Sequence, residues 1–179
     1  VSPWSYYWTT YSLDIPEILN GDKCTYEMRM KNPASEGGIS AYDVVMSITG
    51  SGNGNESVTA ETIWMGNSGA ISYANIRAGK SSASYQTGLV ADVSSWHTIS
   101  FKLNGSQMIA YYDGVERTKI SYSQKIGKIK NVYFQFKGSG SADWAKIYQN
   151  DKLAFIEEFD VAGSTNAKFI DAGLLDVTP

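Results

Sequence analysis

At 179 residues the chain is long enough for one large domain that buries a substantial core. Hydrophobic residues make up 42% of it, charged residues only 18%, and 17 Gly stand against 4 Pro, which is typical of a loop-rich β protein rather than a helical or disordered one. The formal net charge of −3, with basic residues scattered along the chain, gives no electrostatic reason to expect nucleic acid as a partner.

No apolar run reaches the length of a membrane span, so we expect no membrane partner. The single cysteine, Cys24, cannot form an internal disulfide, and redox chemistry therefore indicates no compartment. Because the chain begins at Val1 rather than Met, we expect it to be a piece excised from a larger multidomain protein that is secreted or displayed at the cell surface, and the absence of a signal peptide is then uninformative.

Turn signals separate ten strand-like segments along the chain. Only residues 15–19 look helical, as a single turn around Pro16. The expected strands are residues 25–31, 42–49, 58–65, 70–77, 84–90, 96–103, 108–112, 131–137, 144–149 and 153–160. Many short strands with turn-rich joints predict an all-β fold, a two-sheet antiparallel β-sandwich.

The segment 96–114 carries the clearest local pattern. Ile99, Phe101 and Leu103 alternate with polar residues, which is the period of a strand with one buried face. Asn104-Gly105 then predicts a type I′ hairpin turn, because both residues readily take a positive φ. Residues 108–112 return as the partner strand, and Asp113-Gly114 turns the chain again.

This tryptophan-led hairpin, closed by Asp-Gly, resembles the central hairpin of laminin-G-like domains and other concanavalin A-like lectin/glucanase sandwiches. Residues 131–137, a Gly/Ser loop and residues 142–148 are similar to the penultimate hairpin of these proteins. The resemblance implies a jelly roll of the concanavalin A-like type, a single domain over 1–179 with its core at about 20–160. It also implies that Trp96 packs over the end of the core.

The sequence offers no convincing catalytic site. Glucanases of this superfamily carry carboxylates on one strand as Glu-x-Asp-x-x-Glu or Glu-x-Asp-x-Glu, and the nearest match, Glu157-Glu158-Phe159-Asp160, lacks the third. An acidic strand end facing water explains it better. His97, the only histidine, lies beside Trp96 at a strand start, and a structural role is favoured over a His–Tyr lyase site. We therefore expect no catalytic residue and a protein that is not an enzyme.

Aromatic side chains suit glycan recognition, because their flat faces stack on the apolar face of a sugar. The chain holds 5 Trp, 12 Tyr and 6 Phe, a bias toward aromatic rings that carry a polar N–H or O–H group. Residues 4–11 contain five aromatics, among them Trp8, and form either a sugar platform or a flap over one end of the sandwich. Trp64, Tyr73 and Arg77 would line a concave sheet, unless Trp64 packs in the core and Arg77 is merely solvated.

Two further candidates lie on early and late strands. Glu27 and Arg29 alternate with Tyr26 and two methionines, so both charges stand on the face away from the core, where they either bind a ligand or are merely solvated. Trp144 alternates with core-like neighbours and is expected at the surface.

Taken together, the residues favour a non-catalytic carbohydrate-binding module that holds a polysaccharide or oligosaccharide by Trp/Tyr stacking and Arg/Glu hydrogen bonds. We expect a monomer tethered to a catalytic domain. The alternatives are a laminin-G-like adhesion or spacer domain that binds protein, and a glycosidase or lyase domain. No cofactor is required, although one structural calcium ion on Asp143, Asp160 or Asp14 stays open.

Overall fold

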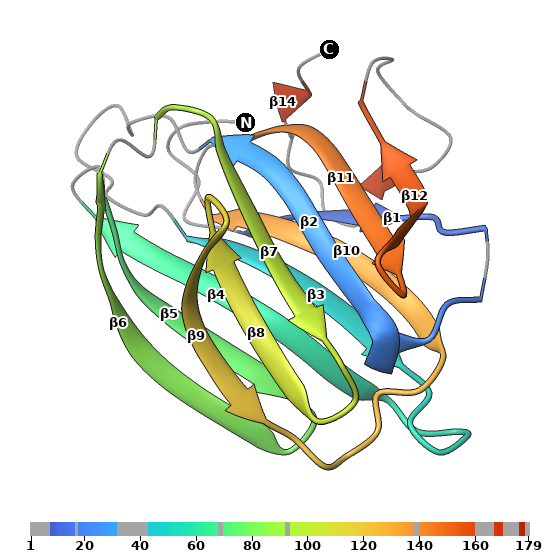
Figure 1. The fold of residues 1–179 in the computed structure, drawn as a ribbon. Helices are drawn as coiled ribbons and strands as arrows, with labels where there is room; N and C mark the ends of the chain where they lie inside the picture. Colours follow the sequence, from blue (N-terminus) through green and yellow to red (C-terminus); the bar gives the residue numbers. More distant parts are fainter. Residues whose placement is uncertain are drawn as a thin grey trace.

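The structure is a computed structural model that describes residues 8–16, 18–31, 43–67, 70–91, 94–137, 140–159, 167–169 and 176–177. Within these residues the chain forms fourteen strands and one short 3-10 helix, η1 (Gly21–Lys23). Figure 1 shows the strands in two packed layers. The all-β antiparallel sandwich predicted from the sequence is confirmed.

Each layer is one sheet. Sheet one follows the order β13 (Ala167–Phe169), β1 (Trp8–Leu13), β10 (Ile129–Lys137), β3 (Val44–Gly50), β4 (Val58–Asn67), β5 (Ala70–Ala78) and β6 (Ser81–Ala91). Sheet two follows the order β12 (Lys152–Glu157), β11 (Ser141–Gln149), β2 (Cys24–Lys31), β7 (His97–Leu103), β8 (Gln107–Tyr112) and β9 (Val115–Ser121). A short β14 (Asp176–Val177) pairs in parallel with β11, and the other pairs are antiparallel.

The ten expected strands correspond to β2–β8 and β10–β12, and four strands were not among them: β1, β9 and the short strands β13 and β14. β1 lies inside sheet one, between β13 and β10, in the aromatic run interpreted as a platform or a flap. β9 is the edge of sheet two and buries only Thr118 fully, so its sequence lacks an apolar stripe. The helical turn expected at 15–19 is wrong for the described residues, which are not helical there.

Aromatic rings fill the space between the two sheets. Tyr11 stacks on Phe134 at 5.5 Å between ring centroids, and Phe159 meets both rings edge-on. At the other side of the core Trp64 contacts Tyr112 edge-on at 5.2 Å. Such ring pairs contribute about 0.5–1.5 kcal/mol beyond the area that they bury.

The two hairpin turns differ from each other. At the first, only Gly105 has a positive φ (+97°), so the central residues are Gly105 and Ser106, as in a type II′ turn. The type I′ turn expected at Asn104-Gly105 is therefore wrong, and the Asn104 side chain instead accepts hydrogen bonds from the backbone N–H of Ser106 and Gln107. The type I′ pattern is found at Asp113-Gly114, where both φ angles are positive (51° and 76°).

One buried carboxylate closes the end of the sandwich at which β2 begins. Asp22 is 7% exposed and accepts hydrogen bonds from Tyr122 Oη (2.9 Å), Ile126 N (3.1 Å) and Gly127 N (2.9 Å). Tyr122 Oη accepts in turn from Gly105 N at 3.1 Å. The carboxylate therefore connects the start of β2, the β7–β8 turn and the segment between β9 and β10.

Replacement of this carboxylate should destabilise the whole fold. Asp22→Asn removes the charge and turns an NH₂ group toward donors, so we expect a loss of about 2–4 kcal/mol of unfolding free energy. Urea unfolding followed by tryptophan fluorescence measures it. Asp151→Asn, which only removes an exposed ion pair with Lys102, should change stability by less than about 0.5 kcal/mol. Equal effects of the two variants would contradict the role given to Asp22.

The thiol of Cys24 should be inert until the fold opens. Burial and then the neighbouring charge of Asp22 raise the pKa of this thiol to about 12, and the thiol donates to Gly21 O at 3.3 Å. Because the thiolate is the reactive species, we expect no labelling by a thiol reagent at neutral pH, and full labelling of the single cysteine in urea. Fast labelling of the native protein at the unfolded rate would contradict this environment.

Candidate functional site

Strand β2 presents two chemically different faces because its residues alternate strictly between the core and solvent. Tyr26 and Met28 have 0% exposure and pack between the sheets, whereas Glu27 and Arg29 are half-buried on the outer side, which faces away from sheet one. The face predicted for Glu27 and Arg29 is thus confirmed. β2 lies between β11 and β7, so its outer side chains have neighbours on both sides.

A β-bulge in β11 adds two side chains to this outer side. Ala142 pairs with Met30 and Trp144 pairs with Arg29, which leaves Asp143 as the extra residue. As a result, Asp143 and Trp144 are both half-buried outside the core, while Ala142 and Ala145 on either side are buried. A bulge re-aims side chains in this way and often does so next to a functional site.

The bulge brings charge and aromatic surface together. The Arg29 guanidinium forms an ion pair with the Asp143 carboxylate and lies 5.1 Å from the centroid of the Trp96 ring. Lys31 Nζ lies 4.7 Å from the same ring, and Lys146 Nζ lies 4.0 Å from the ring of Trp144. We call this surface the β2–β11 face and define it by Glu27, Arg29, Lys31, Trp96, Asp143, Trp144, Lys146 and Tyr148.

The electrostatics of the β2–β11 face depend on Glu27. Desolvation raises the pKa of this carboxyl, and the Lys146 ammonium, which pairs across the strands with it, opposes the rise. Desolvation and then the Glu27 charge raise the pKa of Tyr148, which lies two residue pairs further along the two strands. The face therefore holds a carboxylate that is partly withdrawn from water beside three cationic side chains.

This arrangement has the chemistry of a polar-ligand platform. Two indole rings offer flat apolar area, and the ionic groups between them offer hydrogen-bond donors and acceptors in fixed positions. The cations over the rings show that the ring faces attract positively polarised groups, the property that also attracts the C–H groups of a sugar. Lys146 has a flexible stem and can leave the Trp144 face to a ligand.

The structure separates the other predicted residues from this face. Trp64 has 0% exposure and lies in the core, so its expected place on a ligand-lined sheet is wrong and the core alternative is correct. Arg77 lies on the outer side of sheet one and pairs with Glu61 at 2.8 Å. Tyr73 belongs to β5 and Trp8 to β1, but the side chains of both lie outside the described residues.

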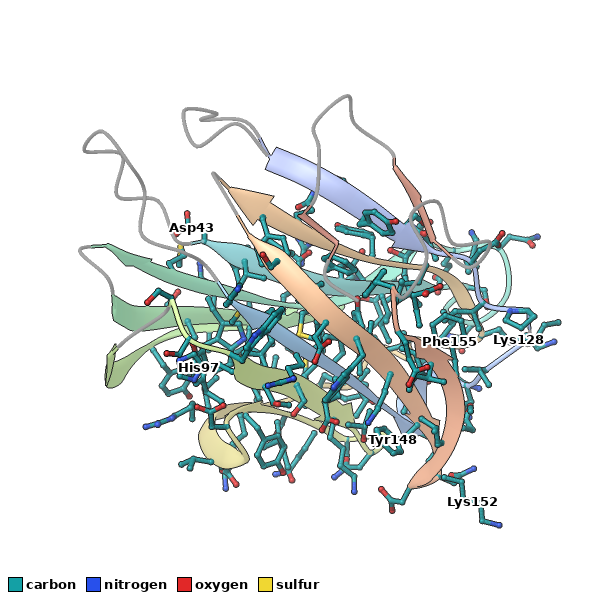
Figure 2. The ribbon with its side chains drawn as sticks, turned by 90° about the horizontal axis from the view of Figure 1, so that it is seen from above. Asp43, His97, Lys128, Tyr148, Lys152 and Phe155 are labelled. Atoms are coloured by element: carbon teal, nitrogen blue, oxygen red, sulfur yellow. The ribbon has the colours of Figure 1, made fainter. Side chains whose placement is uncertain are left out.

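The residues weighed for catalysis are also placed. Glu157 is buried and accepts from Phe159 N at 2.9 Å, so it does not face water as expected, while Glu158 is exposed. His97 Nδ1 lies 2.6 Å from Asp113 Oδ2, and Asp113 Oδ1 accepts from Thr98 N. Figure 2 shows His97 at one end of the sandwich with Asp43, far from Lys128 and Lys152 at the other.

For calcium, the structure places two of the three named carboxylates apart. Asp143 is engaged by Arg29 and Asp14 is exposed after β1, while the side chain of Asp160 lies outside the described residues. The described residues contain no group of three or more His, Cys, Asp or Glu side chains that could hold a metal ion. In the same part of the chain, no helix is long and apolar enough to cross a membrane.

Sequence reasoning missed five members of the β2–β11 face as binding residues: Lys31, Trp96, Asp143, Lys146 and Tyr148. Trp96 was expected to cover the end of the core, and the structure places Arg29 and Lys31 over its half-buried ring. The sequence signal for Asp143 was the break in alternation at Ala142-Asp143-Trp144-Ala145, where two consecutive outward-facing residues lie between two alanines of the core. That pattern is typical of a bulge.

No family model and no curated protein sequence matches this chain. Among solved structures, the mouse laminin α1 chain (domains LG4-5) aligns over 94% of this chain and 45% of its own length, with 8% identity and a TM-score of 0.50. Similar structures include Bacillus licheniformis β-glucanase (14% identity, 72% and 76% coverage, TM-score 0.44) and CG-16, a homodimeric agglutinin from chicken liver (7%, 77% and 99%, 0.49). The laminin match shows a shared fold, and the concanavalin A-like jelly roll predicted from the hairpins is confirmed.

The raised pKa of Glu27 should be visible as a pH dependence of stability. The pKa of Glu27 is higher in the folded protein than in the unfolded chain, so the folded protein releases this proton at a higher pH. The free energy of unfolding therefore falls as the pH rises above about 4.3, the ordinary pKa of Glu. Glu27→Gln removes this loss, so its stability relative to the parent should increase from pH 4 to pH 7 in urea unfolding. The exposed Glu158→Gln is the control, and an identical trend in both variants would contradict the prediction.

Proposed function

We propose that this chain is a non-catalytic carbohydrate-binding module whose glycan ligand lies across the β2–β11 face. The observation that supports the proposal is the convergence of Trp96, Trp144 and the Arg29–Asp143 ion pair on one outer surface. Sugars present an apolar C–H face and a rim of hydroxyls, and this surface offers both complements within a few residues.

Each side chain then has a role in the proposal. Trp144 and Trp96 stack on sugar rings, and Trp144 gives up its contact with the Lys146 ammonium to do so. Asp143 and Glu27 accept hydrogen bonds from hydroxyls, while Arg29 donates to them with its spare N–H groups. The Arg29–Asp143 pair also holds both groups in place before the ligand arrives, which lowers the entropy cost of binding.

A glycosidase is the second candidate, and one observation favours it. Glu27 and Asp143 share the β2–β11 face, and a carboxyl with a raised pKa is what a general acid needs. We favour binding alone because each carboxylate already has a cationic neighbour, Lys146 for Glu27 and Arg29 for Asp143. The Lys146 ammonium opposes the rise in the pKa of Glu27, whereas the acid of a hydrolase pair must hold a proton.

The module acts outside the cell as a monomer, tethered to a catalytic domain that it keeps close to a polysaccharide. Tethering works by raising the effective concentration of the enzyme at the surface of its substrate, so weak binding by one module is sufficient. The module requires no cofactor for this role.

Affinity electrophoresis in gels that carry plant, microbial or fungal polysaccharides tests the proposal. We expect retardation in at least one gel, in calcium and in EDTA alike, with no release of reducing sugar. Trp144→Ala should weaken binding roughly tenfold while leaving the melting temperature unchanged, because the ring packs outside the core. Tyr85→Ala, which removes an exposed ring on β6, is the matched control and should bind normally.

Three outcomes would contradict the proposal in different ways. Retardation that survives Trp144→Ala would place the ligand elsewhere. Release of reducing sugar that disappears in Glu27→Gln would establish the glycosidase. Absence of retardation in every gel would favour a domain that binds protein, as in the laminin-G-like alternative.

A further inference from the structure

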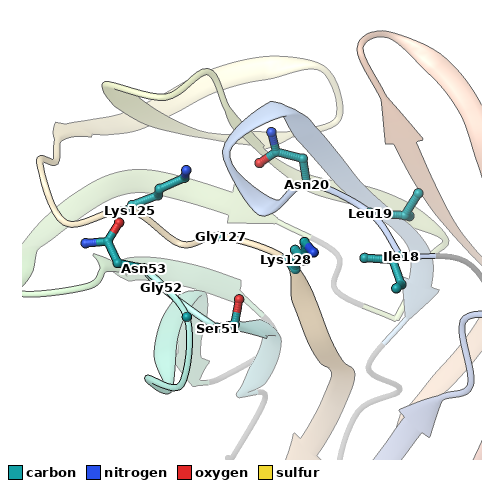
Figure 3. Close-up of a pocket in the computed structure, with 10 residues that line it drawn as sticks. Ile18, Leu19, Asn20, Ser51, Gly52, Asn53, Lys125, Gly127 and Lys128 are labelled. Atoms are coloured by element: carbon teal, nitrogen blue, oxygen red, sulfur yellow. The ribbon is translucent and has the colours of Figure 1, made fainter.

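A pocket of about 550 Å³ lies at the end of the sandwich that Asp22 closes. Three segments surround it: residues 18–20 before η1, residues 51–54 in the β3–β4 turn, and residues 125–128 between β9 and β10. Its lining consists of Ile18, Leu19, Asn20, Ser51, Gly52, Asn53, Gly54, Lys125, Gly127 and Lys128 (Figure 3). The volume falls within the range of roughly 300–1,000 Å³ that is typical of small-molecule sites.

Backbone hydrogen bonds fix the three segments to one another. Ile129 N donates to Leu19 O (2.8 Å), Gly21 N donates to Gly127 O (2.7 Å), and Ser51 N donates to Lys128 O (2.9 Å). Asn20 and Lys128 also form an isolated antiparallel bridge. The pocket walls are therefore preformed, which reduces the cost of ordering them around a ligand.

Glycine is required where the loops meet. Gly127 has a φ of +78°, and a Cβ at this position would lie 2.3 Å from Gly52 O. Gly52 has a φ of +59° in the opposing turn. Only glycine accepts both the left-handed backbone and this close approach, so the narrow contact between the two loops at the pocket is encoded in the sequence.

The charge of the pocket is opposite to that of the chain. Lys125 and Lys128 line it, no described lining residue is acidic, and neither lysine has an ion-pair partner among the described residues. Two acids lie nearby but do not line the pocket: Glu56 accepts from Asn53 N and Asp22 accepts from Gly127 N. Two ammonium groups that have no ion-pair partner in the described part of the chain, in a protein of net charge −3, favour an anion at this place.

The remaining lining groups limit which classes of ligand fit the pocket. Asn20, Asn53 and Ser51 offer amide and hydroxyl groups, and the side chain of Ile18, which is 77% exposed, offers apolar surface. A ligand that fits must combine an anionic group, hydroxyls and an apolar C–H face. A saccharide that carries a carboxylate or a sulfate ester has all three.

We propose that this end pocket is a second binding site, separate from the β2–β11 face, and that it takes an acidic saccharide of one or two sugar rings. Lys125 and Lys128 contact the anionic group, the asparagine amides contact hydroxyls, and Ile18 covers the apolar face of the sugar. Because different strands and loops form the two sites, either site can bind without the other.

Titration of the ¹⁵N-labelled protein with sodium glucuronate, glucose 6-sulfate and glucose tests the proposal by NMR. We expect the amide signals of Gly52, Gly54 and Gly127 to shift with one or both acidic sugars and not with glucose. The carboxylate and sulfate arms tell which anion is preferred. Lys125→Gln/Lys128→Gln should weaken binding at least about tenfold, whereas Lys80→Gln/Lys152→Gln, which changes the net charge equally on exposed surface, should leave it unchanged.

Two further arms make the outcome decisive. Equal shifts with glucose, or with sodium sulfate or sodium acetate alone, would overturn the proposal, because the site would then recognise only a sugar or only an anion. The absence of shifts with either acidic sugar would overturn it as well. Trp144→Ala should retain the glucuronate shifts while it loses polysaccharide retardation. The shifts test the end pocket and the retardation tests the β2–β11 face, so the two proposals can fail independently.

Discussion

The buried carboxylate of Asp22 is the constraint on which one whole end of this sandwich depends. A charge that is withdrawn from water must find hydrogen-bond donors, and this one finds them in a tyrosine hydroxyl and two backbone N–H groups a hundred or more residues away in sequence. To satisfy the charge, the segment between β9 and β10 must lie against the start of β2. The same hydrogen bonds therefore shape the end pocket and position β2.

Strand β2 transmits that placement to the candidate glycan surface. Its inner side chains are fixed by the core, where Tyr26 meets Phe101 edge-on and its hydroxyl donates to Tyr133 O in the opposite sheet. With the inner side fixed, the outer side chains Glu27 and Arg29 have little freedom in where they stand. The rigid β2 backbone thus positions the ionic groups, and the bulge in β11 brings Asp143 and Trp144 up to them.

The two proposed sites differ in how they would discriminate ligands. The β2–β11 face is open and carries both signs of charge, so it suits a neutral or mixed polymer that extends across strands. The end pocket is lined by three segments that include two lysines, so it suits a short acidic sugar. A module with both surfaces would recognise a polysaccharide by its repeating rings at one site and by an acidic unit at the other.

Local physics explains why much of this fold is readable in the sequence. The period of two along β2, β7 and β11 indicates the inward and outward side chains, because strand geometry imposes that alternation wherever one face is buried. It placed Glu27, Arg29 and Trp144 correctly, and the spacing of turn residues located ten of the strands. Where local pattern is weak, as in the polar edge strand β9, the sequence gives no warning of a strand.

Tertiary structure alone decided the rest. Trp64 lies on a strand without a clearly apolar face, and only its packing against Tyr112 from the other sheet shows that it belongs to the core. The pairing of β2 with β11, the bulge at Asp143 and the meeting of three loops around the end pocket all join segments that are remote along the chain. Register between such segments is set by the packing of the complete sandwich, and this is why the sequence determined which residues face outward but not which of them stand together.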